Sequence, residues 1–212
     1  MIINEFLTIL IVIIIGYFFG SIPTAYIVTR FKIGKDIRKL GGGNVGGLNT
    51  FKEVGIIPAT IVTLIDIGKG AAVVAIAHWA LQLDRPYVLI TAIAAVIGHN
   101  WMVWLKFSGG KGMGASIGAL LIIMPIYGYS LELAIFSAIV VIPLLFTRNI
   151  ALSMGLGLLS LPFLFLLGGA HSGILVIWSV VIGLIITAKF TPTALRALAK
   201  TKNIKDFIKG VI

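Results

Sequence analysis

Residues 5–31 read EFLTILIVIIIGYFFGSIPTAYIVTRF, and this stretch decides the class of the fold. It is longer than the roughly 20 apolar residues that a helix needs to cross a bilayer. It begins with Asn4 and Glu5 instead of basic residues, and no small-residue cleavage site ends it, so a signal peptide is not expected. The proline in Gly20–Pro23 predicts a kink, which is either an ordinary transmembrane kink or one that shapes a cavity.

Six further apolar runs follow the first, at about 57–81, 86–105, 112–128, 130–147, 149–168 and 171–189. The 212-residue chain is 59% hydrophobic and only 11% charged, whereas soluble domains carry about 25% charged residues. We therefore expect an all-α, polytopic integral membrane protein with about seven transmembrane helices. No polar insertion is long enough to fold alone, so residues 1–212 are expected to form a single domain.

The net charge of +10 is unevenly placed along the chain. The odd-numbered connections and the tail hold nearly all of the basic residues: Lys32, Lys35, Arg38, Lys39, Lys52, Lys106, Lys111, Arg148, Arg196, Lys200, Lys202, Lys205 and Lys209. The positive-inside rule then predicts an N-terminus outside and a C-terminus in the cytoplasm. Loops at about 32–56 and 106–112 and a basic, interfacial tail at 190–212 would face the cytoplasm. Topology thus explains the charge, and no nucleic-acid partner is expected.

The first cytoplasmic loop is rich in glycine and basic residues. It contains Gly41-Gly42-Gly43-Asn44, followed by Asn49 and Lys52. Glycine lets backbone N–H groups approach an anion closely, and asparagine offers both a donor and an acceptor. A solvated linker is the alternative, but the ordered spacing of glycine and asparagine favours a loop that binds phosphate.

The third connection carries a second glycine-rich segment, Ser108-Gly109-Gly110-Lys111-Gly112, after His99 at the end of a span. A helix that starts near Gly112 would place the Gly109–Lys111 amides at its N-terminus, where an anion is favoured. Met113 stands where a P-loop needs Ser or Thr, so nucleotide hydrolysis is not predicted. His99 is either a general base, a phosphate contact or a packed helix-end residue.

Two charges, Asp66 and Lys69, interrupt the second apolar run. They lie three residues apart on one helix face, roughly 15 Å into the span at about 1.5 Å per residue. Each isolated charge at mid-membrane costs on the order of 2.5–3.5 kcal/mol, so pairing or a polar cavity is expected. The pair is either structural, or Lys69 meets a substrate phosphate while Asp66 holds it.

With these motifs in order, the chain resembles the acyl-phosphate-dependent glycerol-3-phosphate acyltransferases, a family of bacterial seven-span membrane enzymes. The resemblance covers most of the chain and rests on Gly20–Pro23, Gly34–Arg38, Gly41–Asn49, Asp66–Gly70, Gly98–His99, Gly109–Gly112 and Asn203. It implies transfer of a fatty acyl group from acyl phosphate to the 1-hydroxyl of glycerol 3-phosphate at the cytoplasmic face of the cell membrane. Neither a metal nor another cofactor is implied, and the partners are the two substrates and membrane lipid.

The resemblance, read together with the loop chemistry, implies a set of site residues. The catalytic candidates are His99, Lys111 and Asn203. The candidates for substrate or phosphate binding are Arg38, Gly42, Gly43, Asn44, Asn49, Lys52, Asp66, Lys69, Ser108, Gly109, Gly110 and Lys200.

The chain departs from the family pattern at several of these positions. Gly42 replaces a loop serine, Lys52 an arginine, Ser108 a lysine and Lys200 a histidine. The loss of the serine removes a hydroxyl donor. Two alternatives to an active enzyme therefore stay open: a transporter or non-catalytic binder of phosphorylated small molecules or lipids, and a catalytically silent relative.

Overall fold

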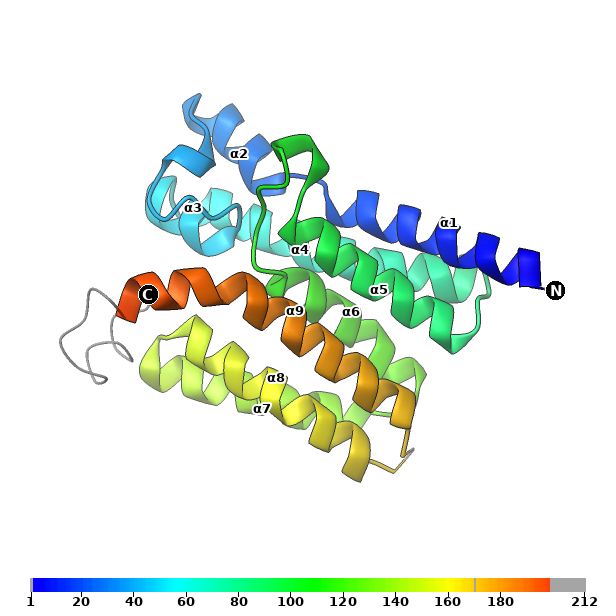
Figure 1. Ribbon diagram of the computed structural model, residues 1–212. Coiled ribbons are helices and arrows are strands. Elements are labelled where there is room, and N and C mark those ends of the chain that lie inside the picture. The colour runs from blue at the N-terminus through cyan, green and yellow to red at the C-terminus, as the bar shows by residue number, and fades with distance from the viewer. Residues whose placement is uncertain (1, 170, 199–212) are drawn as a thin grey trace. The chain divides into compact units, whose positions relative to one another are not determined.

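The computed structural model describes residues 2–169 and 171–198, and the regular structure in these ranges is helical apart from one bridge between Met102 and Ser108 (Figure 1). The chain divides into two compact units, Met1–Ile122 and Ile123–Ile212. The all-helical class is confirmed. The single domain expected over residues 1–212 stays a prediction.

The first unit contains the helices that carry most of the described candidate site residues. Their bounds are α1 Ile2–Gly20, α2 Thr24–Ile33, η1 Ile37–Lys39, α3 Gly47–Glu53, α4 Ile56–Ala75, η2 Ile76–Ala80, α5 Arg85–Asn100 and η3 Val103–Leu105, and α6 Met113–Ile126 begins in this unit. The first helix α1 packs along α5, and α4 contacts α1, α2, α3 and α5 (Figure 1). Two hydrogen bonds join α1 and its end to the end of α5: Tyr17 Oη donates to the Trp101 carbonyl at 2.8 Å, and Ser21 Oγ donates to the Gly98 carbonyl at 3.3 Å.

The second unit is built on three long helices, α7 Ser130–Thr147, α8 Ile150–Leu167 and α9 Gly173–Leu198. Helix α8 packs against both α7 and α9. Tyr129 lies fully buried at the start of α7, where its hydroxyl donates to the Phe165 carbonyl at 3.3 Å and accepts from the Ser172 N–H at 2.9 Å. These bonds tie the loop before α9 to the end of α8.

Five segments of the described chain are long and apolar enough to cross a membrane: Asn4–Ile33, Ile56–Ala80, Ser130–Thr147, Ile150–Leu167 and Gly173–Leu195. These match five of the seven expected spans to within a few residues, apart from the last, which runs further. The apolar α6, over Met113–Ile126, is shorter. A count of seven spans and the orientation of the termini stay predictions.

Three expected boundaries differ from the structure. The helix expected at 86–105 ends at Asn100, because Met102 is extended and Lys106 and Phe107 adopt positive φ angles of 54° and 58°. The kink at Gly20–Pro23 is a full break between α1 and α2. Helix α9 continues past Lys189 to Leu198, with Pro192 inside it.

Candidate active site

The first glycine loop is organised by one buried side chain, Asn49, in the first turn of α3. Its Nδ2 donates to the carbonyls of Ile37, Leu40 and Asn44 at 3.0–3.3 Å, and its Oδ1 accepts the Gly42 N–H at 3.2 Å. The side chain predicted to bind phosphate is thus engaged with the loop itself. Gly43 has a φ of +71°, and its N–H donates to the Leu40 carbonyl. Gly42 is exposed and Asn44 half-buried at the loop surface.

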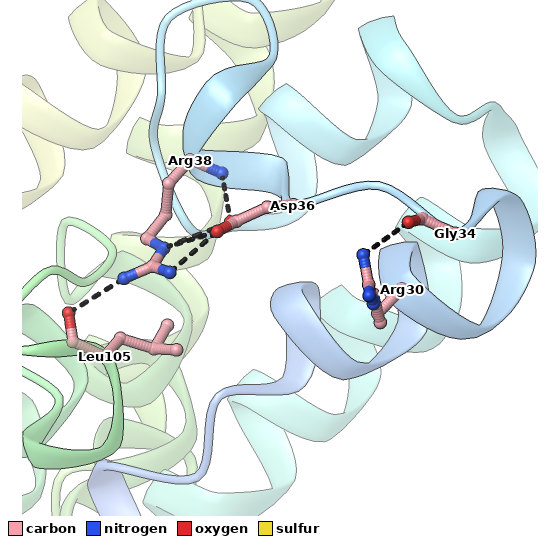
Figure 2. Close-up of polar contacts among 5 residues, drawn as sticks. All are labelled: Arg30, Gly34, Asp36, Arg38 and Leu105. Atoms are coloured by element: carbon pink, nitrogen blue, oxygen red, sulfur yellow. Dashed lines mark hydrogen bonds and ion pairs between the residues drawn. The ribbon is translucent and has the colours of Figure 1, made fainter.

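Arg38 fixes the same loop from its other end (Figure 2). Its guanidinium bonds both oxygens of Asp36 at 2.7–3.1 Å, and its Nη1 donates to the Leu105 carbonyl at 3.1 Å. The bond to Arg38 holds the pKa of Asp36 below its usual value, and the same bond raises the pKa of Arg38. Arg38 was predicted to bind phosphate. In the structure its guanidinium instead links Asp36 of the first loop to the Leu105 carbonyl of the third connection.

The third connection turns back over the end of α5. Its Met102–Ser108 bridge closes a compact turn, after which the Gly110 N–H donates to the His99 carbonyl at 2.9 Å. The Gly109 carbonyl accepts the Val45 N–H at 3.4 Å. Beneath both loops lies a core cluster of Ala25, Ile37, Val45, Val62, Met102 and Leu105. The two glycine-rich segments, Gly41–Asn44 and Gly109–Gly112, are therefore parts of one surface.

Two predicted lysines, Lys52 and Lys111, belong to the two segments that form this surface. Lys111 is half-buried directly before α6, and Lys52 is exposed on α3. Burial lowers the pKa of Lys111, and the nearby positive charge of Lys52 lowers it further. Two like charges held close together favour an anion between them.

Asp66, Lys69 and His99 come together below the loop surface, each at most 4% exposed. Lys69 Nζ lies 2.9 Å from Asp66 Oδ1 and donates to the Ile22 carbonyl at 3.3 Å. His99 Nδ1 lies 3.6 Å from the same carboxylate oxygen. The pairing expected for these mid-span charges is thus present. The Lys69 ammonium also donates a hydrogen bond to the Ile22 carbonyl, between α1 and α2.

Asn100 is a candidate that the sequence pattern did not single out. It is fully buried beside Gly112, and neither polar atom of its amide has a hydrogen-bond partner. Such groups are uncommon in native proteins and point to a ligand, a water or a movement. The signal in the sequence is a polar amide next to His99 at the end of an apolar run. Two predicted site residues, Lys200 and Asn203, lie outside the described residues.

An apolar groove of about 640 Å³ opens between α2 and the start of α4. Its lining includes Ile27, Phe31, Ile57 and Ile61, with Lys32 beside them. A groove of this composition suits a hydrocarbon chain, and the lysine suits a negatively charged end of the ligand.

Comparison with known proteins extends this description. The family model for glycerol-3-phosphate acyltransferase matches residues 10–200. A glycerol-3-phosphate acyltransferase 1 of Dehalococcoides mccartyi is 49% identical over 193 residues, which are 91% of this chain and 89% of the relative. A glycerol-3-phosphate acyltransferase of a Synechococcus species is 34% identical, with 92% and 93% covered. The crystal structure of PlsY, an integral membrane glycerol 3-phosphate acyltransferase, in its glycerol 3-phosphate form is similar with a TM-score of 0.79 at 25% identity, over 90% of this chain and 92% of that one.

Proposed function

The chain belongs to the glycerol-3-phosphate acyltransferase family, and on that premise we propose that it moves a fatty acyl group from acyl phosphate to the 1-hydroxyl of glycerol 3-phosphate. The products are lysophosphatidic acid and inorganic phosphate. We place the reaction at the cytoplasmic face of the cell membrane, in a protein of seven spans with its N-terminus outside. The distribution of basic residues supports this orientation.

The observation that carries the proposal is the joining of the two glycine loops. The Val45–Gly109 hydrogen bond and the Arg38–Leu105 hydrogen bond hold the loops together, with Lys52 and Lys111 close enough to affect each other. A transferase with two phosphorylated reactants needs two neighbouring anion sites. This surface supplies backbone amides and cationic side chains for both.

In the reaction, the glycerol hydroxyl oxygen attacks the carbonyl carbon of the acyl phosphate. The bond from that carbon to the phosphate oxygen breaks, and phosphate leaves with the electron pair. The hydroxyl proton passes to His99 or to a phosphate oxygen of a substrate. Acyl phosphate is an activated anhydride, so positioning and charge neutralisation by Lys111, Lys52 and the loop amides supply much of the acceleration.

The acyl chain needs an apolar place at the membrane boundary. We assign it the groove between α2 and α4, because its lining is apolar and Lys32 lies beside it. Replacing Ile57 with a bulky polar residue is expected to raise the KM for the acyl donor more than the KM for glycerol 3-phosphate.

The deciding experiment incubates the purified protein with palmitoyl phosphate and radiolabelled glycerol 3-phosphate and measures labelled lysophosphatidic acid. Product formation supports the transferase. Saturable binding of glycerol 3-phosphate without product would favour a transporter, a non-catalytic binder or a silent relative. Omitting palmitoyl phosphate and supplying palmitoyl-CoA instead tests the identity of the donor.

A further inference from the structure

The two charged residues of α4, Asp66 and Lys69, are buried and do not reach the surface formed by the two glycine loops. Gly114, in the first turn of α6, lies so close that an added Cβ would be 3.0 Å from Asp66 Cβ. One turn further along each helix, an added Cβ on Gly70 would overlap the Ala115 carbonyl, and one on Gly118 would overlap the Ile67 carbonyl. The face of α4 that carries Asp66 is therefore covered by the backbone of α6. A substrate phosphate has no open approach to this carboxylate.

The ammonium of Lys69 is engaged in the same closed space. It bonds Asp66 at 2.9 Å and the Ile22 carbonyl at 3.3 Å, and its side chain is 2% exposed. The Ile22 carbonyl at the α1–α2 break accepts the Thr24 N–H at 3.0 Å as well as the Lys69 ammonium, so Lys69 is bonded both to Asp66 and to the break. A lysine held in this way is poorly placed to act as a phosphate ligand.

His99 connects this pair with the second glycine loop. Its Nδ1 lies 3.6 Å from Asp66 Oδ1, and the loop lies directly on the other side of the ring, because a Cβ added to Gly110 would overlap His99 Nε2. The Gly110 N–H also bonds the His99 carbonyl at 2.9 Å. Contacts therefore run without interruption from the α1–α2 break through Lys69, Asp66 and His99 to the residue before Lys111.

We propose that Asp66 and Lys69 are positioning residues, which act through His99 to hold the Gly109–Lys111 turn in its anion-binding geometry and do not themselves touch substrate. The inference rests on the proposed function, since it concerns the same turn. It replaces the two sequence-based alternatives, a purely structural pair and a direct phosphate contact, with a third role.

The test uses the double variant Asp66→Asn/Lys69→Met, because a single change would leave one buried charge without its partner. Affinity for glycerol 3-phosphate and for palmitoyl phosphate is measured by calorimetry in detergent, alongside thermal unfolding. We expect at least one of the two ligands to bind about tenfold more weakly in a protein that still unfolds cooperatively. Gly68→Ala, on the same helix and facing open space, is the matched control and should bind as the wild type does.

A double-mutant cycle then separates the three roles. His99→Gln and the combined triple variant are measured with the ligand whose affinity has fallen. If the pair acts through His99, the triple variant binds no more weakly than the poorer of the two parents. Losses that multiply would show a separate contact of Lys69 with the ligand and would overturn the proposal. Unchanged affinity for both ligands in the double variant would also overturn it, in favour of a purely structural pair.

These binding measurements do not depend on turnover. If the wild-type protein binds both ligands but forms no lysophosphatidic acid, the proposed function fails while the positioning role is still tested. If the wild-type protein is active and the double variant keeps its affinities, only the positioning role fails.

Discussion

Glycine has different roles in the two units of the chain. In residues 1–122, several glycines bring one helix backbone directly against another, because an added Cβ would overlap a carbonyl oxygen of the neighbouring helix: Gly16, Gly20, Gly70, Gly98 and Gly118. In the second unit, Gly155, Gly173 and Gly183 face open space. Small residues allow membrane helices to approach closely. The helices of the first unit therefore lie backbone against backbone at these glycines, whereas those of the second unit pack mainly through side chains.

The two units also differ in the kind of polar group that they bury. The second unit buries the Tyr129 hydroxyl in hydrogen bonds to Phe165 and Ser172. The first unit buries a charged pair beside His99 and an amide, that of Asn100, without a partner. Costly polar groups are thus concentrated below the two glycine loops. Such groups commonly mark functional sites, which agrees with the proposal that the two glycine loops of the first unit bind the substrates.

The largest expected effect comes from Lys111. Lys111→Ala should lower transfer by at least about 100-fold, since a cation that neutralises a reacting phosphate is lost from the site. Thermal unfolding in detergent should change little. Lys39→Ala, an exposed lysine on the first loop, serves as the control and should keep wild-type activity. Full activity in the Lys111 variant would remove it from the site.

A pair of asparagines tests the contrast between the units. Asn49→Asp should lower activity by about tenfold or more and reduce stability, because the Asn49 amide donates to three loop carbonyls that a carboxylate would repel. In the second unit, Asn149 Oδ1 caps α8 by accepting the Leu152 N–H at 3.0 Å. Asn149→Ala should cost about 1 kcal/mol of stability without lowering turnover per folded molecule. Equal losses of activity in both variants would contradict the contrast.

Two glycine substitutions test the packing difference itself. Gly20→Ala should destabilise the protein by about 1–3 kcal/mol, because the new methyl group meets the Ala95 backbone. Gly183→Ala lies in open space inside α9 and should be neutral or stabilising by about 0.5–1 kcal/mol. Chemical unfolding in a fixed detergent measures both. A stable Gly20 variant would show that α1 and α5 are less closely fitted than described.

The smallest expected effect is a shift of the pH profile. The pKa of Lys111 is lowered by burial and by Lys52, so its charge is lost as pH rises through a value below that of a free lysine. Activity should therefore fall on the alkaline side earlier than ordinary lysine titration would predict. Lys52→Met removes the neighbouring charge, so the pKa of Lys111 should rise and the alkaline limb of kcat/KM should move to higher pH. An unmoved limb would argue against proximity of the two lysines.

Hydropathy was sufficient to predict most helices, because crossing a membrane demands long apolar runs. The expected run at 130–147 coincides with α7, Ser130–Thr147. The helix predicted over 86–105 was wrong at its C-terminal end, because α5 ends at Asn100. The turn that follows is held by hydrogen bonds from Arg38 and Val45 of the first loop, which is distant in sequence. The break after Gly20 was predicted only as a kink, because a sequence cannot show that Lys69 serves the Ile22 carbonyl.

The sequence suggests candidate site residues, which stay predictions, but it does not show how their side chains are arranged. Gly109, Gly110 and Lys111 are candidates because of their chemistry, and the pairing of Asp66 with Lys69 was predicted from the cost of an isolated charge. Composition does not reveal the direction of a side chain. Asn49 and Arg38 have the donors that a phosphate needs, yet their donors bond the protein's own backbone and Asp36. Asn100 went unassigned because its burial without a partner is a property of packing alone.

The contact between α1 and α5 also limits the order in which the chain assembles during synthesis. Tyr17 meets its partner, Trp101, across 84 positions of sequence. When α1 first enters the bilayer, its glycine face has nothing to fit against until the ribosome has delivered α5. The earliest helix of this protein therefore gains its contacts with α5 only after about half of the chain has been made.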